Sequence, residues 1–125
     1  MAQFNDVQAL RQRAIEDLTV AEIILDSNDE LLAQICFHLQ QFLEKMMKAR
    51  LQEHNVAYTK TRDLVALLKL FPESNLCDEH QAFVSFMSLF AVESRYGSYV
   101  MPPWDGQELT TKSKEFVSLI DSFWD

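Results

Sequence analysis

The 125-residue chain contains only two glycines and three prolines, the residues that most often interrupt regular structure. Because 48% of its residues are hydrophobic, neither a disordered chain nor a β fold with many tight turns is expected. The sequence contains no period-two alternation of a strand, no internal repeat and no low-complexity segment. A single domain over residues 1–125, long enough to bury a core without disulfides, is the simplest organisation.

Long hydrophobic runs are also missing, since none approaches the ~18 residues that a membrane-spanning helix needs. Asp6, Arg11, Arg13 and Glu16 interrupt the N-terminal segment before the apolar core of a signal peptide could form. The sequence therefore predicts a soluble, cytoplasmic protein without membrane contact.

Cysteine and histidine are scarce. Cys36 and Cys77 form no CxxC pair, and the spacing of His38, His54 and His80 around them matches no common zinc pattern. We interpret both thiols as buried or idle in a reducing cytosol, and expect no metal and no cofactor.

Positive charge is outweighed, because 11 Lys and Arg residues face 19 Asp and Glu residues, for a net charge of −8. This balance argues against stand-alone binding to DNA, whose phosphates favour basic surfaces. A local basic groove and a basic protein partner both remain compatible with it.

The most informative stretch is the helix predicted around residues 36–51. Its apolar residues recur at alternating spacings of four and three, which is the period of one helix face. Arg50 falls within the apolar arc, so its guanidinium must reach solvent along its own methylenes or find a partner. The opposite arc is polar but includes Phe37 and Leu51, a small apolar strip that suggests a second contact with a partner chain or a ligand. The apolar face comprises Ile35, Leu39, Phe42, Met46 and Ala49.

Further helices follow from capping residues and the same periodicity. Asn5 or Asp6 can cap the first helix, and Thr59 or Thr61 the third, which Pro72 ends. Trp104 is the expected anchor of the loop before the last helix. Short connections between such helices predict an all-α fold, an antiparallel up-down four-helix bundle with a C-terminal fifth helix. The helices are expected at about residues 5–25, 30–54, 61–71, 77–96 and 108–124.

Three polar groups remain once the apolar core is set aside. Together they supply every candidate site residue: Gln41, Glu44, Lys45 and Lys48 in the second helix; Lys60, Arg62 and Asp63 before the third; Arg95 and Tyr96 at the end of the fourth.

In series, these groups resemble the HEPN domain, the "higher eukaryotes and prokaryotes nucleotide-binding" module. They read Gln-x-x-Glu-Lys-x-x-Lys-Ala from Gln41, Lys-Thr-x-Asp-Leu from Lys60 and Arg-Tyr at Arg95, within residues 14–96. The resemblance implies an antiparallel helical bundle that commonly forms homodimers. It also implies a nucleotidyltransferase partner, because members are often encoded beside a minimal nucleotidyltransferase, whereas other members are ribonucleases.

Two departures from the family pattern weaken the ribonuclease reading. The nucleases carry an arginine followed, after four to six residues, by a histidine. Here no histidine follows His80, and Arg50 precedes His54 by only three intervening residues, in another helix. Arg62 stands where relatives usually have histidine, and an arginine cannot transfer protons near neutral pH. We therefore assign no catalytic residue and expect no metal-free RNA cleavage.

Several interpretations of these residues stay open. Glu44 and Lys48 form either a solvated i,i+4 pair or a site in which Lys45 and Lys48 contact a phosphate or partner. Arg95 either caps its own helix or faces a groove.

The leading hypothesis is a non-catalytic, homodimeric module that partners a nucleotidyltransferase in a toxin–antitoxin-like pair and holds a nucleotide. The second is a divergent ribonuclease toxin that uses Arg95 or Arg62, and the third is a structural dimer without a ligand.

Overall fold

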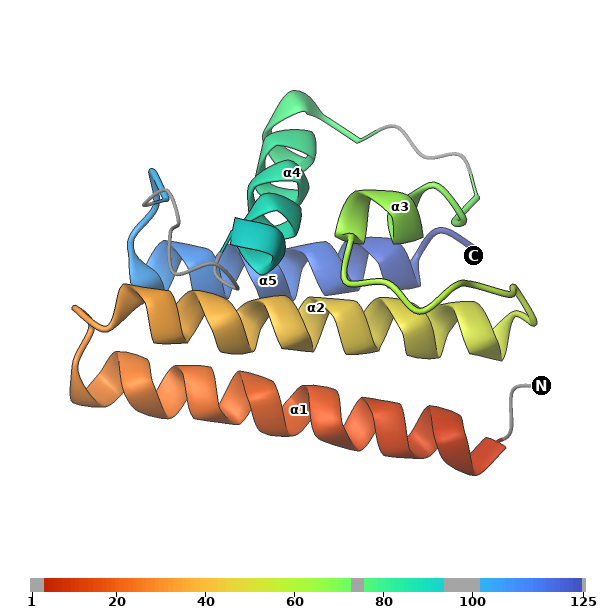
Figure 1. Cartoon of the computed structure of the whole chain (residues 1–125), viewed down its shortest axis with the longest axis horizontal. Coiled ribbons are helices and arrows are strands. Elements are labelled where there is room, and N and C mark those ends of the chain that lie inside the picture. Colours follow the sequence, from red (N-terminus) through yellow and green to blue (C-terminus); the bar gives the residue numbers. More distant parts are fainter. Residues whose placement is uncertain (1–3, 73–75, 94–101, 125) are drawn as a thin grey trace.

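The computed structural model describes residues 4–72, 76–93 and 102–124 of the chain. All five regular elements are helices, no strand occurs within these ranges, and the predicted all-α fold is confirmed (Figure 1). None of the described helices is both long and apolar enough to cross a bilayer. In chain order the helices are α1 (Phe4–Ser27), α2 (Leu32–Glu53), α3 (Leu64–Leu68), α4 (Asp78–Glu93) and α5 (Gly106–Asp121).

Helix α2 is the central helix of the fold, because α1, α3, α4 and α5 all pack against it. Helices α1 and α2 form an antiparallel pair, and α5 lies along α2 in the same direction (Figure 1). Helix α4 crosses these long helices steeply, as both ribbon views show. Helical periodicity predicts which face of a helix is buried but not the angle at which two helices cross. The steep crossing of α4 was therefore not predictable from the sequence.

The predicted apolar face of α2 is confirmed, with each of its five residues at most 9% exposed. Leu51, expected in a strip for a partner or ligand, is instead fully buried, whereas Phe37 of the same strip is 44% exposed. The reason is that residues 54–63 turn back along α2 and cover its C-terminal half (Figure 1). Within this reversal the Val56 amide donates to the Leu51 carbonyl at 2.9 Å.

Arg50 has the partner that its position requires. Its guanidinium donates to the main-chain carbonyl of Asp121, and Nε lies 3.3 Å from the Asp121 carboxylate. The guanidinium also lies 5.7 Å from the centroid of the Trp124 ring. A cation at the C-terminus of a helix is favoured by the helix dipole, so Arg50 fastens the end of α5 to α2.

Several helix bounds differ from the prediction. Helix α1 begins at Phe4, before its expected caps, α2 begins at Leu32 rather than at residue 30, and α3 ends at Leu68, four residues before Pro72. Neither Thr59 nor Thr61 caps α3; the Asp63 carboxylate accepts hydrogen bonds from the amides of Val65 and Ala66 instead. Thr61 accepts from the Asp63 amide and forms the turn before the cap. Helix α5 begins two residues earlier than expected, because Asp105 and Glu108 form a reciprocal capping box.

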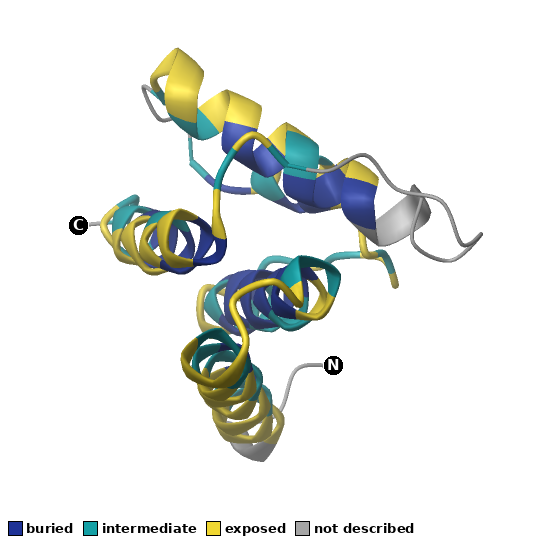
Figure 2. Ribbon diagram, turned by 90° about the vertical axis from the view of Figure 1, so that its left-hand side faces the viewer, coloured by how far each residue is buried: buried dark blue, intermediate teal, exposed yellow. Residues whose placement is uncertain are grey.

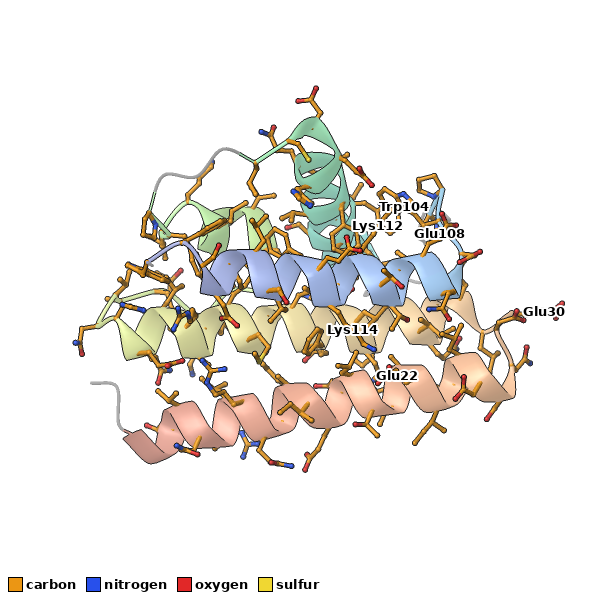
Figure 3. All side chains as sticks on the ribbon, turned by 180° about the vertical axis from the view of Figure 1, so that it is seen from behind. Glu22, Glu30, Trp104, Glu108, Lys112 and Lys114 are labelled. Carbon is orange, nitrogen blue, oxygen red and sulfur yellow. The ribbon has the colours of Figure 1, made fainter. Side chains whose placement is uncertain are left out.

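Trp104 is confirmed as the anchor before α5. Its ring packs edge-on against Phe83 and Phe86 of α4, at centroid distances of 5.7 and 5.8 Å. The Lys112 ammonium of α5 lies 5.4 Å from the Trp104 centroid (Figure 3). The indole therefore joins α4 to the N-terminal half of α5.

Candidate functional site

A row of polar side chains runs along α2 on the side covered by residues 54–63. We call it the buried row, and its members are Gln40, Glu44, Lys48 and Gln52. Gln40 is 2% exposed and Glu44 is 8% exposed. The Glu44 carboxylate accepts from Lys48 Nζ at 3.0 Å and from Gln40 Nε2 at 3.4 Å. The Glu44–Lys48 pair is thus covered by the chain and is no solvated surface pair.

The same row holds residues 54–63 in place. Gln40 Nε2 donates to the Arg62 carbonyl at 3.2 Å, and the Lys48 ammonium lies 5.7 Å from the Tyr58 ring centroid. The Gln52 amide donates to the Tyr58 hydroxyl. Asn55 begins the reversal with φ of 58°, a left-handed conformation that asparagine tolerates better than most residues. The buried row therefore fixes the path of the segment that carries Lys60 and Arg62.

Lys60 and Arg62 are exposed on the outer side of this segment. Within the described ranges, neither side chain makes a hydrogen bond or an ion pair. The main chain of Arg62 is held by Gln40, so its guanidinium projects from an ordered backbone. Of the predicted site residues that the structure describes, these two are the cations best placed to meet an anionic ligand.

Asp63 has a structural role in addition to its predicted place in the site. Besides capping α3, its carboxylate accepts from the Ser88 hydroxyl of α4 at 2.6 Å. The Ser88 hydrogen bond, together with the α3 amides and the Lys69 charge, outweighs partial burial and lowers the pKa of Asp63. Asp63 thereby ties the predicted site segment to α4.

The lowered pKa of Asp63 predicts a pH-dependent stability. A carboxylate whose folded pKa is depressed stabilises the fold above its unfolded pKa of about 3.9, and this contribution is lost as the pH falls through the folded value. Asp63→Asn keeps a capping oxygen but removes the charge. We expect the urea midpoints of wild type and variant to differ by a constant amount above pH 5 and to converge below pH 4. Midpoints that stay equally far apart down to pH 2 would contradict this assignment.

The two lysines predicted to act together in α2 face different neighbours. Lys48 lies in the buried row, whereas Lys45 Nζ donates to the Asp17 carboxylate of α1 at 2.5 Å. His38 Nδ1 lies 3.0 Å from the other Asp17 oxygen. Gln41 flanks the row and donates to the Gln40 side chain at 2.8 Å. Lys45 thus joins α1 to α2 rather than completing the site of Lys48.

The remaining predicted site residues, Arg95 and Tyr96, lie outside the described residues, as does the predicted end of the fourth helix. Sequence reasoning missed Gln40, Gln52, Tyr58 and Ser88. The first two repeat the four-residue step of Glu44 and Lys48, which was an available signal. Tyr58 and Ser88 come from other elements, and no local pattern predicts their contacts with α2 and with Asp63.

The two thiols have different surroundings. Cys36 is buried, and desolvation raises the pKa of its thiol to about 12, so it stays protonated and unreactive. Cys77 is exposed, with Sγ 3.3 Å from His80 Nδ1. No group of three or more His, Cys, Asp or Glu side chains in the described ranges is arranged to hold a metal ion.

A hollow of about 380 Å³ lies between α3, the turn after it and α4. Its wall is mainly apolar, and none of the described candidate site residues lines it. The lining consists of Val65, Leu68, Lys69, Phe71, Pro72, Leu76, Gln81, Val84 and Ser85.

The fold and the site define an all-helical module. Its buried row on α2 lies beneath residues 54–63, which carry the exposed Lys60 and Arg62. Residues 7–123 match the family model described as the HEPN domain. The chain therefore belongs to the HEPN domain family, a family of nucleotide-binding and ribonuclease-type modules. Comparisons with curated proteins and with solved structures give no significant match.

Proposed function

We propose that this HEPN domain is a non-catalytic binding module. It acts as a homodimeric partner of a minimal nucleotidyltransferase, in a toxin–antitoxin-like pair, and holds the phosphates of a nucleotide with Lys60 and Arg62. The observation that carries the proposal is that the charges beneath residues 54–63 are paired, whereas Lys60 and Arg62 on that segment are unpaired among the described residues. Glu44 and Lys48 neutralise each other beneath the segment, and the two cations above them stay exposed.

The absence of catalysis is supported by the contacts of Arg50 and His54, the one arginine–histidine pair that lies close together in the sequence. Arg50 is bound to Asp121 at the end of α5, and the His54 ring stacks on Trp124 with centroids 3.9 Å apart. A general acid or base must reach the reacting hydroxyl or leaving oxygen. Both side chains instead serve the packing of the C-terminal residues, and no histidine follows His80 in the chain.

Binding of an anion is supported by the local charge, which is opposite to that of the whole chain. Residues 54–69 contain three Lys and Arg residues and one acidic residue, Asp63. The cations just before them, Lys45, Lys48 and Arg50, are paired with carboxylates and do not add to this charge. A concentration of one sign attracts an oppositely charged ligand even on a chain with net charge −8. Charge-assisted hydrogen bonds from lysine and arginine to phosphate oxygens are also stronger than neutral ones.

A calorimetric titration with ATP and GTP tests the nucleotide role. We expect saturable binding of at least one of them, and about a tenfold or greater loss of affinity in Lys60→Gln/Arg62→Gln, because charged hydrogen bonds are lost. Lys114→Gln is the matched control, since Lys114 is an exposed cation paired with Glu22 far along the chain. It should bind like wild type.

The partner role and the absence of catalysis need separate measurements. Sedimentation and co-purification with the adjacent gene product should give a dimer that captures a nucleotidyltransferase. A monomer that captures neither protein nor nucleotide would refute the proposal. RNA degradation by the purified protein that disappears in Arg62→Ala would establish the ribonuclease alternative instead.

A further inference from the structure

The outer side of α1 carries an unusual share of the exposed apolar surface. Seven large hydrophobic side chains are exposed in the described part of the chain, and four of them belong to α1 or the turn after it. They are Ile15 (51% exposed), Val20 (37%), Ile23 (59%) and Leu31 (43%).

The core of the domain does not use this side of α1. Helix α1 packs chiefly against α2, and it buries its opposite side there through Ala14 and Ala21, both 0% exposed. Figure 2 shows α1 at the edge of the molecule, with its outward side exposed. Ile15, Thr19 and Ile23 follow at steps of four residues, so they form one ridge along the helix. We call this ridge, together with Val20, the outer α1 face.

The surroundings of the outer α1 face are acidic. Residues 14–43 contain six Asp and Glu residues and no Lys or Arg. Asp17 is occupied by Lys45 and His38, and Glu22 pairs with Lys114 of α5 (Figure 3). Glu16 and Asp26 are exposed among the side chains of the face, and Asp29 and Glu30 are exposed at its C-terminal end.

We propose that the outer α1 face binds a cationic amphipathic helix of a partner protein. The ridge of Ile15, Thr19 and Ile23 fits the groove of a second helix, and burial of its two exposed isoleucines supplies the driving force. Lysines or arginines beside the apolar stripe of that helix meet the exposed carboxylates, which steer and orient the complex.

Charge also selects this occupant over a second copy of the same face. Two outer α1 faces brought together would place their exposed carboxylates close to one another, which is unfavourable. The proposal goes beyond the proposed nucleotide role, because the face lies on α1 and includes none of residues 54–63. Failure of one proposal therefore leaves the other standing.

The test uses a fluorescein-labelled synthetic 18-residue peptide of leucine and lysine, with leucines at helical positions i, i+3, i+4 and i+7. Fluorescence anisotropy at two salt concentrations measures its binding to the full chain. We expect saturable binding that weakens at least about tenfold in Ile15→Ser/Ile23→Ser, because the apolar contact is lost. In Glu16→Gln/Asp26→Asn/Glu30→Gln, both the affinity and its salt dependence should fall.

Matched controls make the result specific. Leu89→Ser removes an equally exposed side chain, 49% exposed, from α4 and should leave binding unchanged. A peptide of the same composition in scrambled order, without an apolar stripe, should bind weakly. Circular dichroism melts should coincide for all variants, because every replaced side chain is exposed.

Three outcomes would overturn the proposal. The first is no binding of the amphipathic peptide, or equal losses in the α1 and α4 variants. The second is equally tight binding of the scrambled peptide. The third is a wild-type dimer in sedimentation that Ile15→Ser/Ile23→Ser dissociates, because the face would then be an interface between two copies of this chain.

Discussion

Replacement of Glu44 by alanine is expected to lower the free energy of unfolding by about 3 kcal/mol, although Glu44 looks like an ordinary helix-surface residue in the sequence. Its carboxylate is the only anion paired with Lys48 among the described residues, and the two side chains are 11% and 14% exposed. Removal of the acid leaves an ammonium under residues 54–63 without a counter-charge, and Gln40 loses an acceptor. Equilibrium unfolding in urea measures the loss.

A double variant separates the lost partner from the lost packing. Glu44→Leu/Lys48→Met removes both charges and keeps most of the apolar volume, so it should recover most of the stability that Glu44→Ala loses. Glu22→Ala is the matched control, because it breaks an exposed pair with Lys114 and should cost less than about 1 kcal/mol. A loss below 1 kcal/mol in Glu44→Ala would mean that water reaches Lys48 and screens it.

The Glu44 result also bears on the nucleotide proposal. If the buried row fixes residues 54–63, Glu44→Ala should release Lys60 and Arg62 from their ordered backbone and weaken nucleotide binding without removing either cation. Glu44→Leu/Lys48→Met should restore binding along with stability, because the segment is again packed on α2. A positioning role is thereby distinguishable from a direct phosphate contact by Lys48.

The helical period correctly predicted the features that depend on one helix alone. The buried face of α2 followed from spacings of three and four, and Arg50 was identified as a residue in need of a partner because it lay inside that face. The identity of its partner was not predictable, because Asp121 lies 71 residues away in α5. Leu51 was misplaced for a related reason: helical position does not tell whether a later segment returns to cover that face.

Capping residues were predictable by type but not by position. Thr59, Thr61 and Asp63 can all cap a helix, and the geometry of the turn selects Asp63, with Thr61 bonded to its amide. The candidate site shows the same limit. Lys45 and Lys48 are one turn apart on α2, but Asp17 of α1 faces only Lys45, so tertiary packing separates two residues that the motif places together.

Replacement of Phe83 by alanine should give the largest loss of stability, about 4 kcal/mol, because it removes a fully enclosed ring between three elements. Phe83 is 1% exposed, and its ring lies 5.7 Å from the Trp104 centroid and 6.5 Å from that of Phe116 in α5. Its neighbours are themselves packed in the core, so they cannot easily move to fill the cavity. Urea unfolding gives the total loss, and tryptophan emission measured in a Trp124→Phe background reports whether the surroundings of Trp104 open.

The control for Phe83 lies on the same helix. Leu89→Ala changes a side chain that is 49% exposed and should cost less than about 0.5 kcal/mol, although it removes a residue of similar hydrophobicity. Phe83→Leu should lose less than Phe83→Ala, because leucine retains part of the volume. Equal losses in the Phe83 and Leu89 alanine variants would show that α4 is not held through this aromatic contact. The attachment of α4 would then depend on Asp63 and Ser88, and Ser88→Ala would become the more damaging change.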